Sequence, residues 1–80
     1  MEDFQVLSRR QIEFGIWIRN YRRAHELSLD QFARIIGQYA GTTPTAWSVN
    51  RWETFQAIPS EKYMKAVLAA IQITINDLDN

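Results

Sequence analysis

The sequence predicts an all-α fold, a compact bundle of four to five short helices. Two observations predict it. Apolar residues recur at spacings of three and four along most of the 80 residues, which is the period of a helix with one buried face. Helix-capping signals separate these apolar stretches from one another. Alternation with period two occurs only at 71–75, which is too short to form a sheet alone.

The composition is that of one small globular domain. Apolar residues make up 46% of the chain and charged residues 22%, which is too hydrophobic for a disordered protein. Because cysteine is absent, we expect no disulfide and no thiolate metal site. No other metal and no cofactor are expected either. The chain has neither an apolar run long enough for a bilayer nor signal-peptide features at its start, so we expect a cytoplasmic protein without a membrane partner. Residues 1–7 form an N-terminal extension to a single domain at 8–80.

The first helix is expected over about 9–25. Ser8 and Gln11 have the spacing of a capping box, in which each side chain bonds the other's backbone N–H. The stripe that follows predicts the buried face of this helix, and its members are Phe14, Trp17, Ile18 and Tyr21.

A second capping box, Ser28 with Gln31, predicts the start of the next helix. Its apolar residues are spaced i, i+3, i+4, i+7, namely Leu29, Phe32, Ala33 and Ile36. The residues alone allow two alternative positions for the C-terminal end of this helix. Either Gly37 closes this helix, or the helix continues to Ala40 and Gly41 caps it.

Thr43 followed by Pro44 predicts the start of a third helix that ends near Thr54. Val49 and Trp52 are expected to point inward from it. A loop at 55–59 leads to Ser60, which is expected to cap a fourth helix. Its predicted buried stripe consists of Met64, Val67, Leu68 and Ile71. Thr74 is expected to cap one last short turn through Leu78.

The charge is balanced overall but unevenly placed. Nine Lys and Arg match nine Asp and Glu, which by itself argues against a nucleic-acid binder. Residues 8–51, however, carry seven arginines and three carboxylates, a net charge of +4. Arginine is suited to phosphate and base edges, although any one arginine can also belong to an ordinary solvated helix surface. A local basic face predicts modest, salt-sensitive affinity for nucleic acid.

Several segments, in this order and spacing, resemble the phage-repressor or Cro-type helix-turn-helix domains of the XRE-like family, with a lambda-repressor-like fold. The resemblance covers about 12–78. It is carried by GIWIRNYR at 15–22, LSLDQFARIIG at 27–37, SVNRWE at 48–53, Pro59, and IQITINDL at 71–78. It implies that the second helix crosses the phosphate backbone of duplex DNA and that the third lies in the major groove.

Residues near the start of the third helix are then the candidates for base contacts. Arg51 can donate to guanine through two bonds, and Asn50 can pair with adenine. Trp47 on such a face can cover a thymine methyl, but we expect it to pack into the core or against the preceding loop. The full set of base-contact candidates is Thr45, Ala46, Trp47, Ser48, Asn50 and Arg51.

The resemblance also implies an ion pair between Arg22 and Glu53, with a role in folding and orientation. The expected phosphate contacts are drawn from the basic and polar positions of the first three helices. They are Arg19, Arg23, Ser28, Gln31, Arg34 and Thr43.

The sequence departs from the family in three places. Six residues separate Gly37 from Pro44, so either the second helix is longer or a loop bulges beside the groove. Leu29 stands where the family often has a phosphate-contacting glutamine, and Gln31 is the available substitute. Glu26 replaces the usual glycine, and a left-handed conformation there would be mildly strained.

The expected function is that of a transcriptional regulator, a repressor that binds a palindromic operator on double-stranded DNA as a homodimer. An enzyme is disfavoured because the chain has one histidine, no cysteine and no glycine-rich phosphate loop. The alternative is a protein-binding helix-turn-helix adaptor, or an antitoxin that neutralises a toxin partner.

Overall fold

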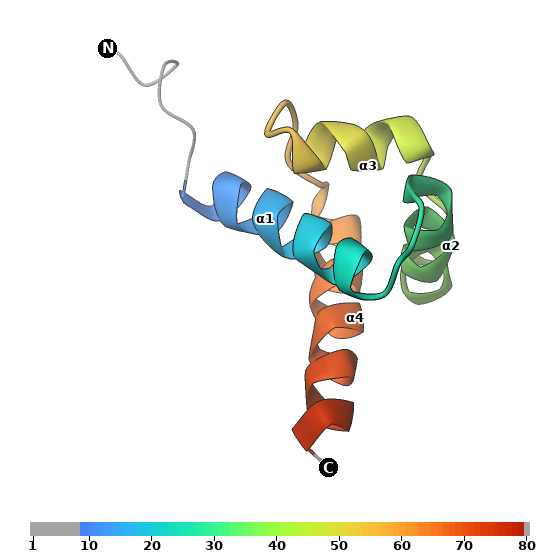
Figure 1. Ribbon diagram of the computed structural model, residues 1–80. Coiled ribbons are helices and arrows are strands. Elements are labelled where there is room, and N and C mark those ends of the chain that lie inside the picture. The colour runs from blue at the N-terminus through green and yellow to red at the C-terminus, as the bar shows by residue number, and fades with distance from the viewer. Residues whose placement is uncertain (1–8, 80) are drawn as a thin grey trace.

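The computed structural model describes the backbone of residues 9–79 and the side chains of residue 9 and residues 11–72. Every regular element in this part of the chain is a helix, which confirms the all-α class. The α1 helix lies across the front of the molecule, with α3 above it and α2 beside its end, and α4 passes behind α1 and projects beyond the bundle (Figure 1). The helices are α1 (Arg9–Ala24), α2 (Leu29–Ala40), α3 (Ala46–Glu53) and α4 (Glu61–Asp79).

The predicted capping box at the start of α2 is confirmed. The Ser28 hydroxyl accepts a bond from the Gln31 backbone N–H at 3.0 Å, and the Gln31 side-chain oxygen accepts one from the Ser28 N–H at 2.8 Å. Of the two alternative ends predicted for this helix, the structure has the later one, at Ala40. Gly41, with a left-handed φ of 89°, closes α2 by donating its N–H to the carbonyl of Gly37 at 2.9 Å. The extra turn takes up three of the six residues between Gly37 and Pro44.

The predicted start of α3 is wrong by two residues. Thr45, not Thr43, is the N-cap, and its hydroxyl accepts the backbone N–H of Ser48 at 3.0 Å. The reason lies in a tertiary contact. A Cβ added to Gly37 would lie 2.9 Å from the Thr43 Cα, so Thr43 is packed directly against α2 and the chain stays non-helical until it has cleared that contact.

The fourth helix differs from the prediction at its end. Its first turn begins as expected, with the Ser60 carbonyl accepting the N–H of Met64 at 2.7 Å. The separate last turn capped by Thr74 is wrong, because α4 continues without a break to Asp79. Neither glycine nor proline occurs between residues 61 and 79, so nothing in the backbone stops the helix. The predicted cap of α1 at Ser8 lies outside the described residues.

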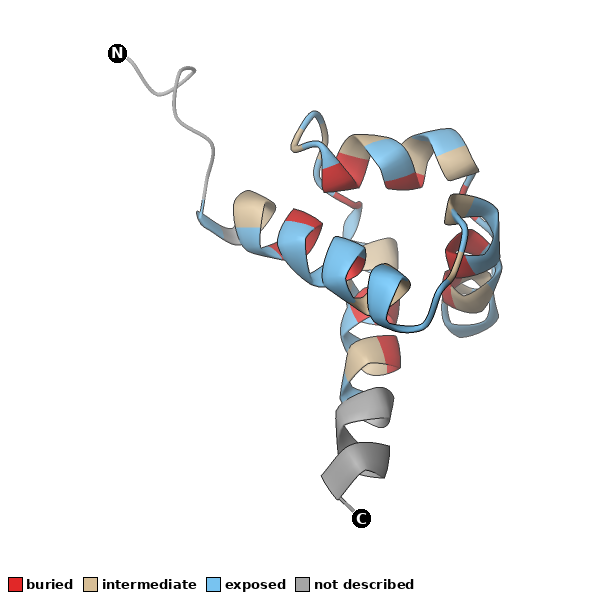
Figure 2. Ribbon diagram, in the orientation of Figure 1, coloured by how far each residue is buried: buried red, intermediate tan, exposed pale blue. Residues whose placement is uncertain are grey.

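All four helices contribute to one core, and Figure 2 shows their buried residues turned toward one another. Val49 and Trp52 point inward as predicted. Trp17 and Leu68, however, are 41% and 40% exposed, so both are wrongly placed in the predicted buried stripes. The buried core residues are Phe14, Ile18, Phe32, Ala33, Ile36, Val49, Trp52, Ala66, Val67 and Ala70.

The misplacement of Leu68 has a simple geometric cause. The face of α4 that packs against the bundle is formed by Ala66, Val67 and Ala70, and successive residues of a helix are turned by about 100°. Leu68 therefore lies on nearly the opposite side from Ala66 and Ala70. The α4 helix thus has a second apolar side that the bundle does not cover.

Candidate nucleic-acid interface

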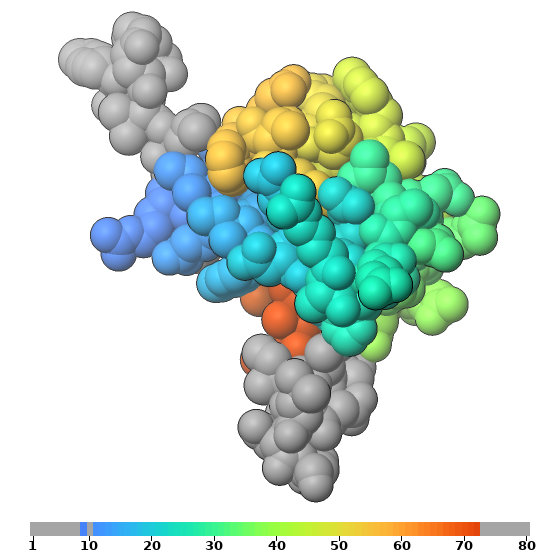
Figure 3. All heavy atoms as spheres, viewed as in Figure 1, coloured from blue at the N-terminus to red at the C-terminus, as the bar shows by residue number. Residues whose placement is uncertain are grey.

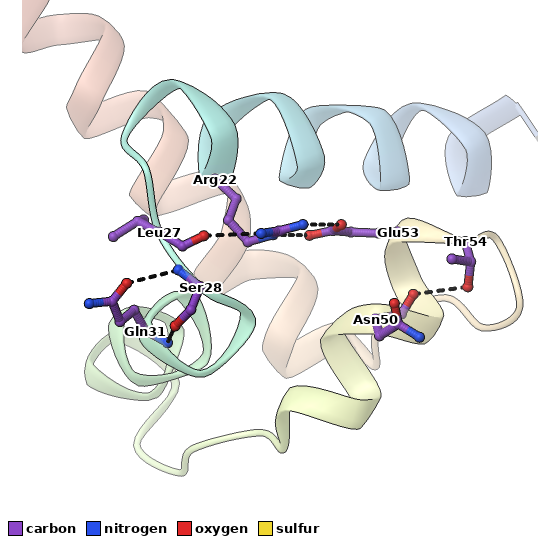
Figure 4. A network of polar contacts seen from close by, with 7 residues as sticks. All are labelled: Arg22, Leu27, Ser28, Gln31, Asn50, Glu53 and Thr54. Carbon is purple, nitrogen blue, oxygen red and sulfur yellow. Dashed lines mark hydrogen bonds and ion pairs between the residues drawn. The ribbon is translucent and has the colours of Figure 1, made fainter.

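An ion pair joins α1 to the end of α3. Arg22 donates from Nε to Glu53 Oε2 at 2.6 Å and from Nη2 to Oε1 at 2.9 Å, and its Nη1 donates to the Leu27 carbonyl at 3.0 Å (Figure 4). Glu53 is buried, with 6% of its side chain exposed. The hydrogen bond to Glu53 raises the pKa of Arg22 above its usual value, against the opposing effect of burial. The pair implied by the resemblance is therefore present, and it fixes the distance between the two helices.

Two further contacts hold the end of α3 against α1. A Cβ added to Gly15 would lie 2.6 Å from the Phe55 ring and 2.7 Å from the Trp52 carbonyl oxygen, so only glycine allows this approach. One turn earlier on α1, the Gln11 side-chain amide donates to the Phe55 carbonyl at 3.1 Å. These contacts and the ion pair give α3 a single position relative to α1.

The face of α3 that points away from the core carries Trp47, Asn50 and Arg51. Trp47 is 67% exposed, so the expectation that it packs into the core or the loop is wrong. The inward face of this eight-residue helix is already taken by Val49, Trp52 and Glu53, and Trp47 lies on the opposite side. The Arg51 guanidinium covers the Trp47 ring, with Cζ 4.8 Å from the ring centroid.

The first turn of α3 is occupied by its own cap. The Thr45 hydroxyl accepts the Ser48 N–H and donates to the Ser48 hydroxyl, both at 3.0 Å, and Ala46 is half-buried. Asn50 is exposed, and only its backbone carbonyl is bonded to Thr54, at 2.9 Å from the Thr54 hydroxyl (Figure 4). Of the six candidates for base contacts, Trp47, Asn50 and Arg51 are therefore the three whose side-chain groups face outward and take no part in the helix cap.

The residues predicted to contact phosphate are spread over the first two helices and the connection that follows. Arg19 and Arg23 are exposed on α1, and Arg19 comes one turn after Gly15, beside the face that meets α3. Arg34 is exposed and paired with Asp30 at 2.8 Å. Figure 3 shows α1, α2 and α3 side by side on one face of the molecule. These arginines therefore lie on the two helices that contact α3.

The polar phosphate candidates have local roles. Ser28 and Gln31 bond each other in the capping box, while the Gln31 amide nitrogen points away from that bond (Figure 4). Thr43 is exposed but packed against Gly37.

Glu26 has a positive φ of 55°, as expected for the position that replaces the family's glycine. Phe55 shares this conformation, with φ 64°.

Two contacts near the site were not predicted. Gln11 was expected only in a helix cap, and its bond to Phe55 joins residues 44 apart in the chain. Thr54 donates its hydroxyl to the Asn50 carbonyl and accepts from the Gln56 side chain at 3.1 Å. Nothing in the local sequence signals the first contact, whereas a threonine four residues after Asn50 is a recognisable helix-end pattern.

A second surface feature lies between α1 and α4. A hollow of about 360 Å³ is lined by Trp17, Leu68, Ile71 and Gln72. Ile16, the neighbour of Trp17, is 43% exposed. Ile71 also packs against the core, and the Trp17 ring centroid lies 5.5 Å from that of the buried Phe14, but about 40% of Trp17 and of Leu68 remains exposed.

The rest of the described chain shows neither of two other kinds of site. No group of three or more His, Asp or Glu side chains in it is placed to hold a metal ion. None of the helices at 9–79 combines the length and apolar character needed to cross a membrane. Comparisons with family models, with curated proteins and with solved structures give no match to this chain.

Proposed function

We propose that this protein binds double-stranded DNA in a sequence-dependent way, with the outward face of α3 in the major groove. The observation that carries the proposal is the outward position of Trp47, Asn50 and Arg51 on one side of a short helix that is fixed to the bundle at its far end. Trp47 and Asn50 are exposed, and Arg51 is half-buried. Tryptophan is enriched at interfaces, where its ring offers a large apolar area, and an indole this exposed beside Asn50 and Arg51 supports a ligand surface.

The three side chains supply complementary chemistry. Arginine donates two parallel bonds to O6 and N7 of guanine, asparagine pairs with N6 and N7 of adenine, and an apolar group contacts the thymine methyl. The Arg22–Glu53 ion pair supports this function indirectly, because it orients α3 without using any group on the outward face.

The flanking arginines supply the electrostatic part of binding. Arg19, Arg23 and Arg34 are exposed on α1 and α2, and each phosphate contact makes affinity fall with salt. The Asp30 partner of Arg34 and the overall neutrality weaken this attraction. We therefore propose a homodimer, which combines two modest half-site affinities on a palindromic operator, and a cytoplasmic repressor that acts by occupying promoter DNA.

The test is salt-dependent retention of duplex DNA by Arg51→Ala and by a charge-matched control. Lys65→Ala removes an exposed cation on α4, away from α3. We expect Arg51→Ala to stay folded and to lose retention, while Lys65→Ala binds like the wild type. Wild-type protein that retains no duplex at low salt, or an Arg51→Ala variant that binds normally, overturns the proposal.

The second candidate is a protein-binding adaptor or antitoxin, favoured by the apolar hollow at Trp17, Leu68 and Ile71. A patch of this kind suits a partner protein such as a toxin. The two candidates differ in one measurement. An adaptor gives no retardation of duplex DNA at any salt concentration, whereas a DNA-binding regulator gives retardation that disappears steeply as salt rises.

A further inference from the structure

The outward face of α3 contains a prearranged pair. Trp47 and Arg51 are four residues apart on the helix, and the Arg51 guanidinium lies over the Trp47 ring with Cζ 4.8 Å from its centroid. Among the large hydrophobic residues whose side chains the structure describes, Trp47 is the most exposed, at 67%. Stacking on the indole is favourable for a cation and limits the rotamers that Arg51 can adopt. The arginine is therefore partly ordered before any ligand arrives.

The Arg51 guanidinium lies over the Trp47 ring and the residue is half-buried. The N–H groups of arginine lie in the plane of the guanidinium, so in a flat stack the ring blocks none of them. Holding the fork in place lowers the entropy lost when it forms two parallel bonds. The exposed part of the indole, meanwhile, offers an apolar surface directly beside those donors. A polar donor fork and an apolar patch thus sit next to each other on one helix face.

The separation of the two groups selects a spacing on the ligand. Neighbouring base pairs in duplex DNA are about 3.4 Å apart along the axis, and pairs two steps apart are about 7 Å apart. The distance of 4.8 Å between the guanidinium and the indole centroid is closer to the first value. Both groups can therefore contact two adjacent base pairs at once.

We propose that Trp47 and Arg51 act as one unit that reads a thymine adjacent to a guanine. Arg51 donates to O6 and N7 of the guanine, and the Trp47 indole covers the C5-methyl of the neighbouring thymine. This inference rests on the proposed DNA-binding function and deepens it, because it names the base step that α3 selects. Trp47 is then a specificity-determining residue whose effect includes the orientation of Arg51.

The first experiment selects binding sites from a random duplex pool with the wild-type protein. The enriched duplexes should share a thymine next to a guanine. Selection with Trp47→Ala should still enrich guanine but lose the preference for thymine beside it. Because Trp47 is largely exposed, this variant is expected to fold, which circular dichroism checks.

The second experiment changes single atoms of the selected duplex and does not depend on a protein variant. Replacing the thymine by uracil removes only the methyl group, and the wild type should bind roughly fourfold more weakly, the effect of one buried methyl. Replacing the guanine by 7-deazaguanine removes only N7 and should weaken binding by about fivefold or more. The uracil effect should disappear in Trp47→Ala, and the 7-deazaguanine effect should disappear in Arg51→Ala.

A third variant separates charge from geometry. Arg51→Lys retains the positive charge but lacks the planar fork, so it should weaken the preference for guanine while keeping the salt dependence of binding.

The outcomes distinguish the two proposals. Specific binding whose enriched sites lack an adjacent thymine and guanine, or an equal uracil effect in wild type and Trp47→Ala, overturns the inference and leaves the DNA-binding function standing. No binding to any duplex at low salt overturns both.

Discussion

Removing the Arg22 side chain is the sharpest test of how α3 is held. Arg22→Ala takes away both bonds to Glu53 and the bond to the Leu27 carbonyl. The Glu53 carboxylate, with 6% of its side chain exposed, then remains buried without its cation. The mutation therefore removes hydrogen bonds and also strands a charge.

The expected cost follows from the burial of the two partners. Breaking a fully buried ion pair by removing one member costs about 3–5 kcal/mol. Arg22 retains 21% exposure, so water can enter beside Glu53 and reduce the penalty. We expect the free energy of unfolding to fall by about 2–4 kcal/mol, which for a domain of this size lowers Tm by roughly 10–25 °C.

Urea and thermal unfolding followed by circular dichroism measure this loss. The matched control is Arg23→Ala, which removes the adjacent, exposed arginine of α1 and should change stability by less than about 0.5 kcal/mol. Adding Glu53→Leu to Arg22→Ala should restore part of the lost stability, because no buried charge is then left unpaired. Equal urea midpoints for Arg22→Ala and Arg23→Ala would refute the reasoning.

Two backbone positions give further predictions. Gly15→Ala should lower the free energy of unfolding by about 1–3 kcal/mol, because the added methyl meets the Phe55 ring and the Trp52 carbonyl. The Cβ of Gly41→Ala meets nothing within 4 Å, so this variant should be destabilised only by the roughly 1 kcal/mol that a left-handed conformation costs alanine. Glu26→Gly should raise stability by as much as about 1 kcal/mol, since glycine relieves the strain at φ 55°. Chemical denaturation measures all three, and a Gly15→Ala variant as stable as the wild type, or a less stable Glu26→Gly variant, would contradict these expectations.

The local features of the fold were predictable because their causes lie within a few residues. The Ser28–Gln31 capping box spans one turn, and the buried stripe of Phe32, Ala33 and Ile36 follows the helical period. Signals of this kind need no information about the rest of the chain. They identified all four helices and the all-α class.

The residues of the candidate site were only partly predictable. The positions of Asn50 and Arg51 on α3 came from the resemblance, and the pair of Arg22 with Glu53 joins residues 31 apart. The start of α3 moved by two residues because Thr43 packs on Gly37, a contact that no local cap signal contains.

Amino-acid order alone determined that this chain forms short amphipathic helices and that Ser28 caps the second of them. The tertiary structure decided which side of each helix is covered. Trp47 is exposed because Val49 and Trp52 already occupy the inward face of α3, and Leu68 is exposed because α2 packs on the small residues of α4. An apolar side chain shows only that its burial would be favourable. Whether it is buried depends on how the helices pack against one another.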